Sequence, residues 1–100
     1  MNITLVGSRY FGAAAFDALR RDVTIAQVVV PAVDDRLAIA ANAAGVAVRV
    51  LADARIVPGD AIADGTDLIV AAHTHARVSD DALARSRLRG IGYHPSLLPR

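Results

Sequence analysis

The stretch Asp67-Leu-Ile-Val-Ala-Ala72 decides the fold class, because every residue after the aspartate is apolar. A strand without polar alternation is buried on both faces, which is typical of parallel sheets covered by helices. Four other segments are predicted as strands from their apolar or β-branched character: residues 2–6, 24–30, 47–51 and 91–94. The sequence therefore predicts a five-stranded sheet.

Two helical segments are predicted between the first three strands. In residues 10–21, the apolar side chains that share one helical face are Phe11, Ala15, Ala18 and Leu19. In the second helix, Asp34 or Asp35 provides the N-cap and Gly45 the left-handed stop, and the buried stripe consists of Leu37, Ala40, Ala41 and Ala44.

Two more helical segments are predicted before the last strand. A weak one lies around residues 61–63, after the Pro58-Gly59 turn. Ser79 caps the other and Gly90 closes it, with acids in the first turn and arginines near the end: Asp80, Asp81, Arg85, Arg87 and Arg89.

The alternation of strand and helix predicts an α/β fold with a Rossmann-like, doubly wound, mainly parallel five-stranded sheet and helices on both faces. We expect residues 1–100 to form a single unit of this fold. Ligands of such sheets bind beyond the carboxyl ends of the strands. This edge would contain residues 7–12, Pro31, residues 73–77 and His94 onward.

Composition narrows the classes of function. The formal charge is +1, and acids alternate with arginines along the chain, so no basic patch indicates nucleic acid. No apolar run reaches the ~20 residues that span a bilayer, and the amino terminus lacks a signal-peptide pattern. Cysteine is absent, which fits a reducing compartment. We expect a cytoplasmic protein with a small-molecule substrate and no membrane partner.

The turn between the first strand and the first helix could favour an anion at the helix amino terminus. It contains Gly7, Ser8, Arg9 and Gly12, but Arg9 occupies the place of the second glycine of a dinucleotide-binding motif. The alternative interpretation is that its glycines let strand and helix pack closely.

Histidines lie at the end of one predicted strand and directly after another. On extended backbone His73 and His75 would point to the same side, and His94 could approach from the neighbouring strand end. Three imidazoles could hold zinc, yet no glutamate or cysteine reinforces such a set, so we predict no metal site and expect a pocket lining instead.

His94 is the sharpest candidate for catalysis. Pro95 biases its backbone towards an extended conformation, which would deliver the imidazole to the ligand edge. An imidazole there is suited to proton transfer near neutral pH. The alternative is a partly buried histidine that only hydrogen-bonds a carbonyl.

The run Tyr93-His-Pro-Ser-Leu-Leu-Pro-Arg100 resembles the signature of the folate-dependent formyltransferases, and residues 1–12 are similar to the opening of that family. Its Tyr-His-Pro-Ser form is most similar to the formyl-hydrolase domains of 10-formyltetrahydrofolate dehydrogenases. The resemblance implies a one-carbon donor, 10-formyltetrahydrofolate, whose formyl group passes to an amine or, in the hydrolases, to water.

The resemblance also implies roles for individual residues. His94 would be the catalytic histidine, acting on the developing oxyanion. The donor would contact backbone groups of Ala76, Arg77 and Val78, whereas Gly7, Ser8, Arg9 and Gly12 would face the acceptor substrate.

The sequence departs from the family pattern in several places. Gly92 stands where most members have an asparagine, the segment after Pro31 looks shorter, and residues 73–75 replace apolar or small residues. The family's catalytic aspartate would fall beyond Arg100, so we expect the amino-terminal portion of a longer formyltransferase domain, with little activity by itself.

Two alternatives remain open. One is a non-catalytic Rossmann-type module that binds a nucleotide or another ligand. The other is a chain whose uncovered sheet edge favours a homo-oligomer.

Overall fold

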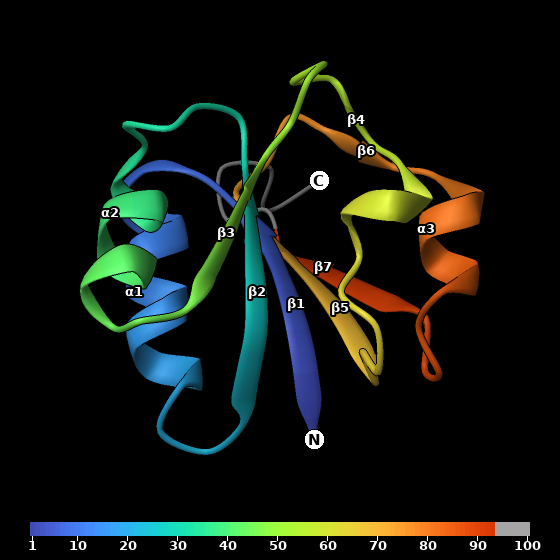
Figure 1. The fold of residues 1–100 in the computed structure, drawn as a ribbon, viewed down its shortest axis with the longest axis horizontal. Coiled ribbons are helices and arrows are strands. Elements are labelled where there is room, and N and C mark those ends of the chain that lie inside the picture. Colours follow the sequence, from blue (N-terminus) through green and yellow to red (C-terminus); the bar gives the residue numbers. More distant parts are fainter. Residues whose placement is uncertain (94–100) are drawn as a thin grey trace.

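The computed structural model describes residues 1–93, which form a five-stranded, all-parallel sheet in the order β3-β2-β1-β5-β7 (Figure 1). The strands are β1 (Asn2–Gly7), β2 (Thr24–Val30), β3 (Ala47–Val50), β5 (Leu68–Ala72) and β7 (Gly90–Tyr93). The predicted fold class is confirmed.

The helices lie on both faces of this sheet (Figure 1). One face is covered by α1 (Arg9–Leu19) and α2 (Arg36–Ala43). The short 3-10 helix η1 (Gly59–Ala61) and helix α3 (Asp80–Ala84) lie on the other face. The weak helical segment predicted around residues 61–63 is thus a single turn that begins earlier, directly after Pro58.

A second, two-stranded sheet was not predicted from the sequence. Its parallel strands are β4 (Ile56–Val57) and β6 (Arg77–Val78). Each strand has only two residues, which is too short for a periodic pattern to indicate it. This small sheet ties the segment after β5 to the segment after β3.

Strand alternation divides the core into two layers, one on each face of the sheet. Leu5 and Val28 face α1 and α2, where Phe16 and Leu37 complete a fully buried cluster. Val6 and Val29 belong to the other cluster. That second layer also contains Val57, Ala61, Ile69, Ala76 and Ala82.

In α1 the buried face differs from the predicted one. Phe16 and Gly12 are buried, whereas Phe11, Ala15 and Leu19 are only partly buried. Ala18 is exposed, so its predicted place on the buried face is wrong. Close packing of α1 against the sheet turns Gly12 and Phe16, one helical turn apart, towards the core.

In α2 the predicted caps are confirmed. Asp35 is the N-cap, and its carboxylate accepts a hydrogen bond from the Leu37 amide at 2.9 Å. Gly45 has a φ of 75°, the left-handed conformation expected for a residue that ends a helix. Local capping signals therefore located both ends of this helix.

Helix α3 is shorter than predicted. Ser79 caps it through a 3.0 Å hydrogen bond from the Ala82 amide, but it ends at Ala84, before the three arginines. The left-handed residue is Arg89, with a φ of 64°, and Gly90 instead begins β7. A Cβ atom on Gly90 would lie 3.1 Å from the Ile69 carbonyl oxygen, so this glycine permits close strand approach.

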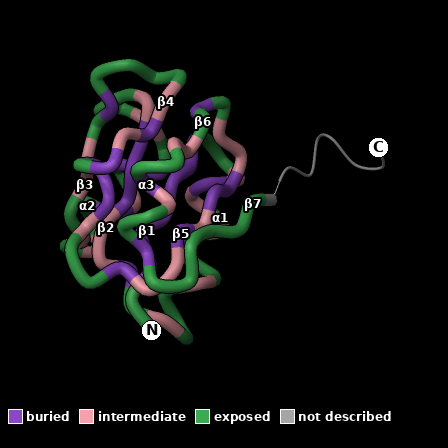
Figure 2. Tube along the Cα trace, turned by 90° about the vertical axis from the view of Figure 1, so that its right-hand side faces the viewer, coloured by how far each residue is buried: buried purple, intermediate pink, exposed green. Residues whose placement is uncertain are grey.

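Among residues 1–93, β7 is one of the two edge strands of the five-stranded sheet, β3 being the other, and the exposed parts of the chain in Figure 2 include β7. Its Ile91 side chain is 60% exposed. Among residues 1–93, no helix is long and apolar enough to cross a membrane.

Candidate functional site

The carboxyl ends of three neighbouring strands lie level with one another. Gly7 at the end of β1 pairs with Ala72 at the end of β5, and Ala72 pairs with Tyr93 at the end of β7. Strands β2 and β3 follow β1 on one side of the sheet, whereas β5 and β7 lie on the other side of β1. The edge between β1 and β5 is therefore the switch point at which open α/β sheets bind ligands.

Ser8 and His73, the first residues after β1 and β5, are joined by a hydrogen bond. The Ser8 hydroxyl donates to the His73 carbonyl oxygen at 2.6 Å, and Ser8 is only 5% exposed. His73 has a φ of 53°, a left-handed backbone conformation that residues other than glycine rarely adopt. Because its hydroxyl is used in this way, Ser8 makes no side-chain cap for α1 although it is the N-cap residue.

Asp35 takes over the missing capping role at α1. Both of its carboxylate oxygens accept from the Arg9 amide, at 2.9 and 3.1 Å, and Arg9 has a φ of 58°. The same carboxylate caps α2 at Leu37. One negative charge therefore lies at the amino termini of two helices, where the helix dipoles favour it.

Gly7 and Gly12 allow α1 to lie close against the sheet. A Cβ atom on Gly7 would be 2.6 Å from the Ala72 carbonyl oxygen, and one on Gly12 would be 3.3 Å from the Gly7 backbone. These distances agree with the packing interpretation of the turn. A phosphate at the α1 amino terminus would have to lie beside the Asp35 carboxylate, which disfavours a dinucleotide there.

The two histidines after β5 lie together. Their ring centroids are 6.1 Å apart with an interplanar angle of 76°, an edge-to-face arrangement. The condition for both rings to point to the same side, an extended backbone, is not met, because His73 is left-handed. Residues 1–93 contain no group of three or more side chains that could hold a metal ion.

The three residues expected to contact a one-carbon donor have different surroundings. Ala76 is buried in the second core layer. The Arg77 amide already donates to the Arg55 carbonyl oxygen at 2.8 Å, and Arg77 and Val78 form strand β6. Of the three, Val78 alone lines the cavity described next.

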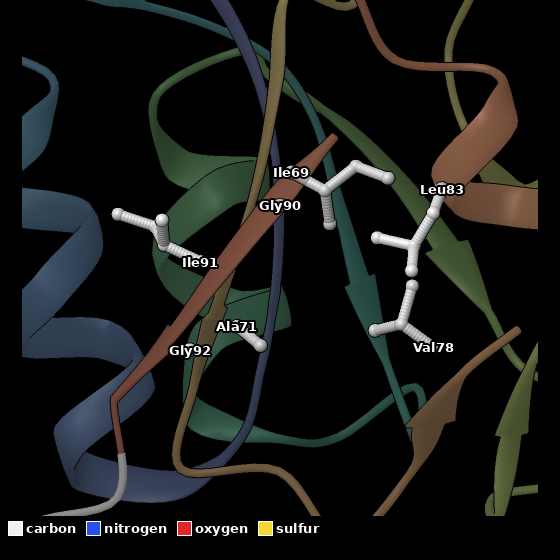
Figure 3. A pocket seen from close by; sticks show the side chains of 7 residues that line it. All are labelled: Ile69, Ala71, Val78, Leu83, Gly90, Ile91 and Gly92. Carbon is white, nitrogen blue, oxygen red and sulfur yellow. The ribbon is translucent and has the colours of Figure 1, made fainter. Parts of the chain in front are cut away.

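A cavity of about 190 Å³ lies between the β5–β7 edge and the segment β6–α3. Figure 3 shows Ile69, Leu83 and Val78 directed towards one another on one side of β7, with Ile91 pointing away from them. Ala71, Gly90 and Gly92 complete the lining, so no titratable side chain contributes. This cavity suits an apolar group and differs from the polar edge around Ser8 and His73.

The aspartates whose pKa values are shifted among residues 1–93 accept hydrogen bonds from other residues of the chain. Asp67, just before β5, has its pKa lowered mainly by a hydrogen bond from the Asn2 amide and then by Arg87. The Asp53 pKa is lowered by hydrogen bonds from Arg55. Both acids are charged at neutral pH and have structural partners, so neither suggests a general acid or base.

His94, the predicted catalytic residue, lies outside the described residues. The structure adds Asp35 to the site, which the sequence had shown only as a helix cap. Its contact with Arg9 spans 26 positions of the chain and carries no local signal. A scan against protein-family models and a search of curated proteins found no match to this chain.

Proposed function

We propose that this chain is part of a folate-dependent formyltransferase that takes the formyl group of 10-formyltetrahydrofolate and transfers it to an amine. One observation supports this best. The sequence run His-Pro-Ser-Leu-Leu-Pro follows directly after β7, whose last residue is level with the ends of β1 and β5 at the ligand edge.

The proposed reaction is acyl transfer. The amine nitrogen forms a bond to the formyl carbon and gives up a proton, and the bond from that carbon to N10 breaks, with a proton going to N10 of the departing tetrahydrofolate. His94 would donate a hydrogen bond or a proton to the oxygen that gains charge in between. In the alternative, water replaces the amine and formate is the product.

The carboxyl edge at β1 and β5 supports a formyltransferase over a dinucleotide-binding module. The amino terminus of α1 is capped by the Asp35 carboxylate, and Arg9 precludes the close backbone approach that the missing glycine would permit. By contrast, an uncharged acceptor amine carries no negative charge for Asp35 to repel.

Incubation of the complete gene product with 10-formyltetrahydrofolate tests the proposal. We expect tetrahydrofolate to appear, either with an added amine or with water alone, and formate analysis separates the two reactions. If no tetrahydrofolate forms with water or any amine supplied, the proposed function is wrong. Tight binding of NAD or NADP in a titration would instead favour the dinucleotide module.

A further inference from the structure

Among residues 1–93, two buried serines donate hydrogen bonds to the carbonyl oxygens of left-handed residues. The Ser8 hydroxyl donates to the carbonyl of His73, whose φ is 53°, at 2.6 Å. The Ser86 hydroxyl donates to the carbonyl of Arg89, whose φ is 64°, at 2.7 Å. Both serines are 5% exposed. The two arrangements differ in where they lie, and the Ser86 hydroxyl also donates to the Asp67 carbonyl oxygen at 2.9 Å.

The two serines lie at opposite edges of the sheet, and only the edge that binds ligands suggests a role beyond stabilising the fold. Arg89 precedes β7, at the amino edge of the sheet. His73 follows β5, at the carboxyl edge and beside the end of β1. Strained non-glycine residues persist only where the surrounding structure fixes them, and they are frequent at ligand sites. Only the Ser8 contact lies at such an edge.

His73 determines how the loop leaves β5. The chain bends at this left-handed residue, and the imidazoles of His73 and His75 lie edge to face. The Thr74 hydroxyl accepts a hydrogen bond from the Ala76 amide at 3.1 Å, and Ala76 is itself buried. The loop is therefore fixed at its carboxyl end. If His73 relaxed to extended backbone, both rings would change direction.

We propose that Ser8 is a positioning residue: its hydroxyl holds His73 left-handed, and the loop conformation so fixed, residues 73–76, sets the affinity of the edge for the one-carbon donor. This inference rests on the proposed function for the identity of the donor. It does not require Ser8 to touch the donor or to take part in the chemistry.

The first test is nuclear magnetic resonance of the chain with Ser8→Ala, using Ser86→Ala as the matched control. We expect Ser8→Ala to shift the backbone and imidazole signals of His73 and His75, and Ser86→Ala to shift those of Arg89 and leave the histidines unchanged. Ser8→Thr, which keeps the hydroxyl, should restore the native histidine signals. Unchanged histidine signals in Ser8→Ala would overturn the inference.

The second test uses the kinetics of the complete gene product. Loss of one hydrogen bond corresponds to roughly a fivefold change in an equilibrium constant. We expect Ser8→Ala to raise KM for 10-formyltetrahydrofolate about fivefold, with kcat little changed, and Ser86→Ala to leave KM unchanged. An equal rise in KM for both variants would show a general loss of stability and overturn the inference.

A third measurement covers the case in which Ser8→Ala does not fold. Glycine adopts the left-handed conformation without help, so His73→Gly should make the Ser8 hydroxyl dispensable. In the His73→Gly background, Ser8→Ala should then fold, and it should raise the unfolding equilibrium constant far less than it does in the native protein. Equal effects in both backgrounds would contradict the inference.

These tests also separate the inference from the proposed function. A native product that consumes no 10-formyltetrahydrofolate overturns the proposed function and, with it, the assignment of the donor. The resonance and stability measurements would still show whether Ser8 fixes the His73 loop.

Discussion

The Asp35 carboxylate joins the amino termini of two helices by accepting from the amides of Arg9 and Leu37. Ser8, the N-cap of α1, cannot make this cap because its hydroxyl is bonded to His73. Because Asp35 caps α1, the Ser8 hydroxyl can donate to the His73 carbonyl oxygen at the sheet edge instead. The capping of α1 and the conformation of the loop after β5 are linked through this exchange of partners.

Replacement of Asp35 should destabilise the protein because both helices lose a cap. We expect Asp35→Ala to lower the free energy of unfolding by about 1–3 kcal/mol, since a single N-cap contributes about 0.5–2 kcal/mol. Chemical denaturation measures this. The exposed neighbour Asp34 is the control, and Asp34→Ala should stay within about 0.5 kcal/mol of the native value. Similar losses in both variants would contradict the dual-cap role.

The two glycines at the α1 turn should respond differently to alanine. In Gly7→Ala the new methyl group would collide with the Ala72 carbonyl at 2.6 Å, so we expect a loss of about 1–3 kcal/mol in unfolding free energy. In Gly12→Ala the closest contact is 3.3 Å, and the gain from placing alanine in a helix, about 0.5–1 kcal/mol, offsets it. Thermal or chemical unfolding that shows equal losses would refute this difference.

Asp67 should make the stability depend on pH in acid. Hydrogen bonds from Asn2 and Arg87 lower its pKa in the folded protein, so its contribution is present above the unfolded pKa of about 3.9. This contribution is lost as the pH falls through the lower folded value. We expect Asp67→Asn to reduce stability at pH 7 and to matter progressively less below about pH 4. Denaturation curves across this range provide the measurement.

Asp64→Asn is the matched control for Asp67, because Asp64 is a nearby aspartate whose side chain is exposed. It should leave the slope of stability against pH unchanged. A constant difference between the native protein and Asp67→Asn at every pH would show that the lost contact does not depend on ionisation.

His94 should control turnover without affecting the fold. In the complete gene product, we expect His94→Ala to reduce kcat by about 10²–10⁴-fold, the usual contribution of a general acid or base. Circular dichroism should show unchanged secondary structure. Full activity of this variant would remove His94 from the mechanism and leave the proposed donor untouched.

Features governed by local sequence could be predicted. The apolar run of β5, the cap at Asp35 and the stop at Gly45 each depend on neighbouring residues, and the structure contains all three. The class of fold followed from the alternation of these segments.

Features that depend on distant contacts could not be predicted. Among residues 1–93, three residues other than glycine are left-handed: Arg9, His73 and Arg89. They have no sequence signal, since each depends on surrounding contacts. The β4–β6 pair is too short to leave a pattern. For the site, the sequence predicted that the strand ends lie at one edge. The Ser8–His73 and Asp35–Arg9 contacts could be found only in the three-dimensional structure.

The order of the strands has a consequence for biosynthesis. Nearly all residues of the core layer beneath α1 and α2 precede residue 50, so this half can begin to assemble on the ribosome. The opposite face of the central β1 must wait until β5 and α3 have been synthesised. A nascent chain of this protein thus exposes Val6 and Val29 for a defined interval, during which a chaperone would protect them from aggregation.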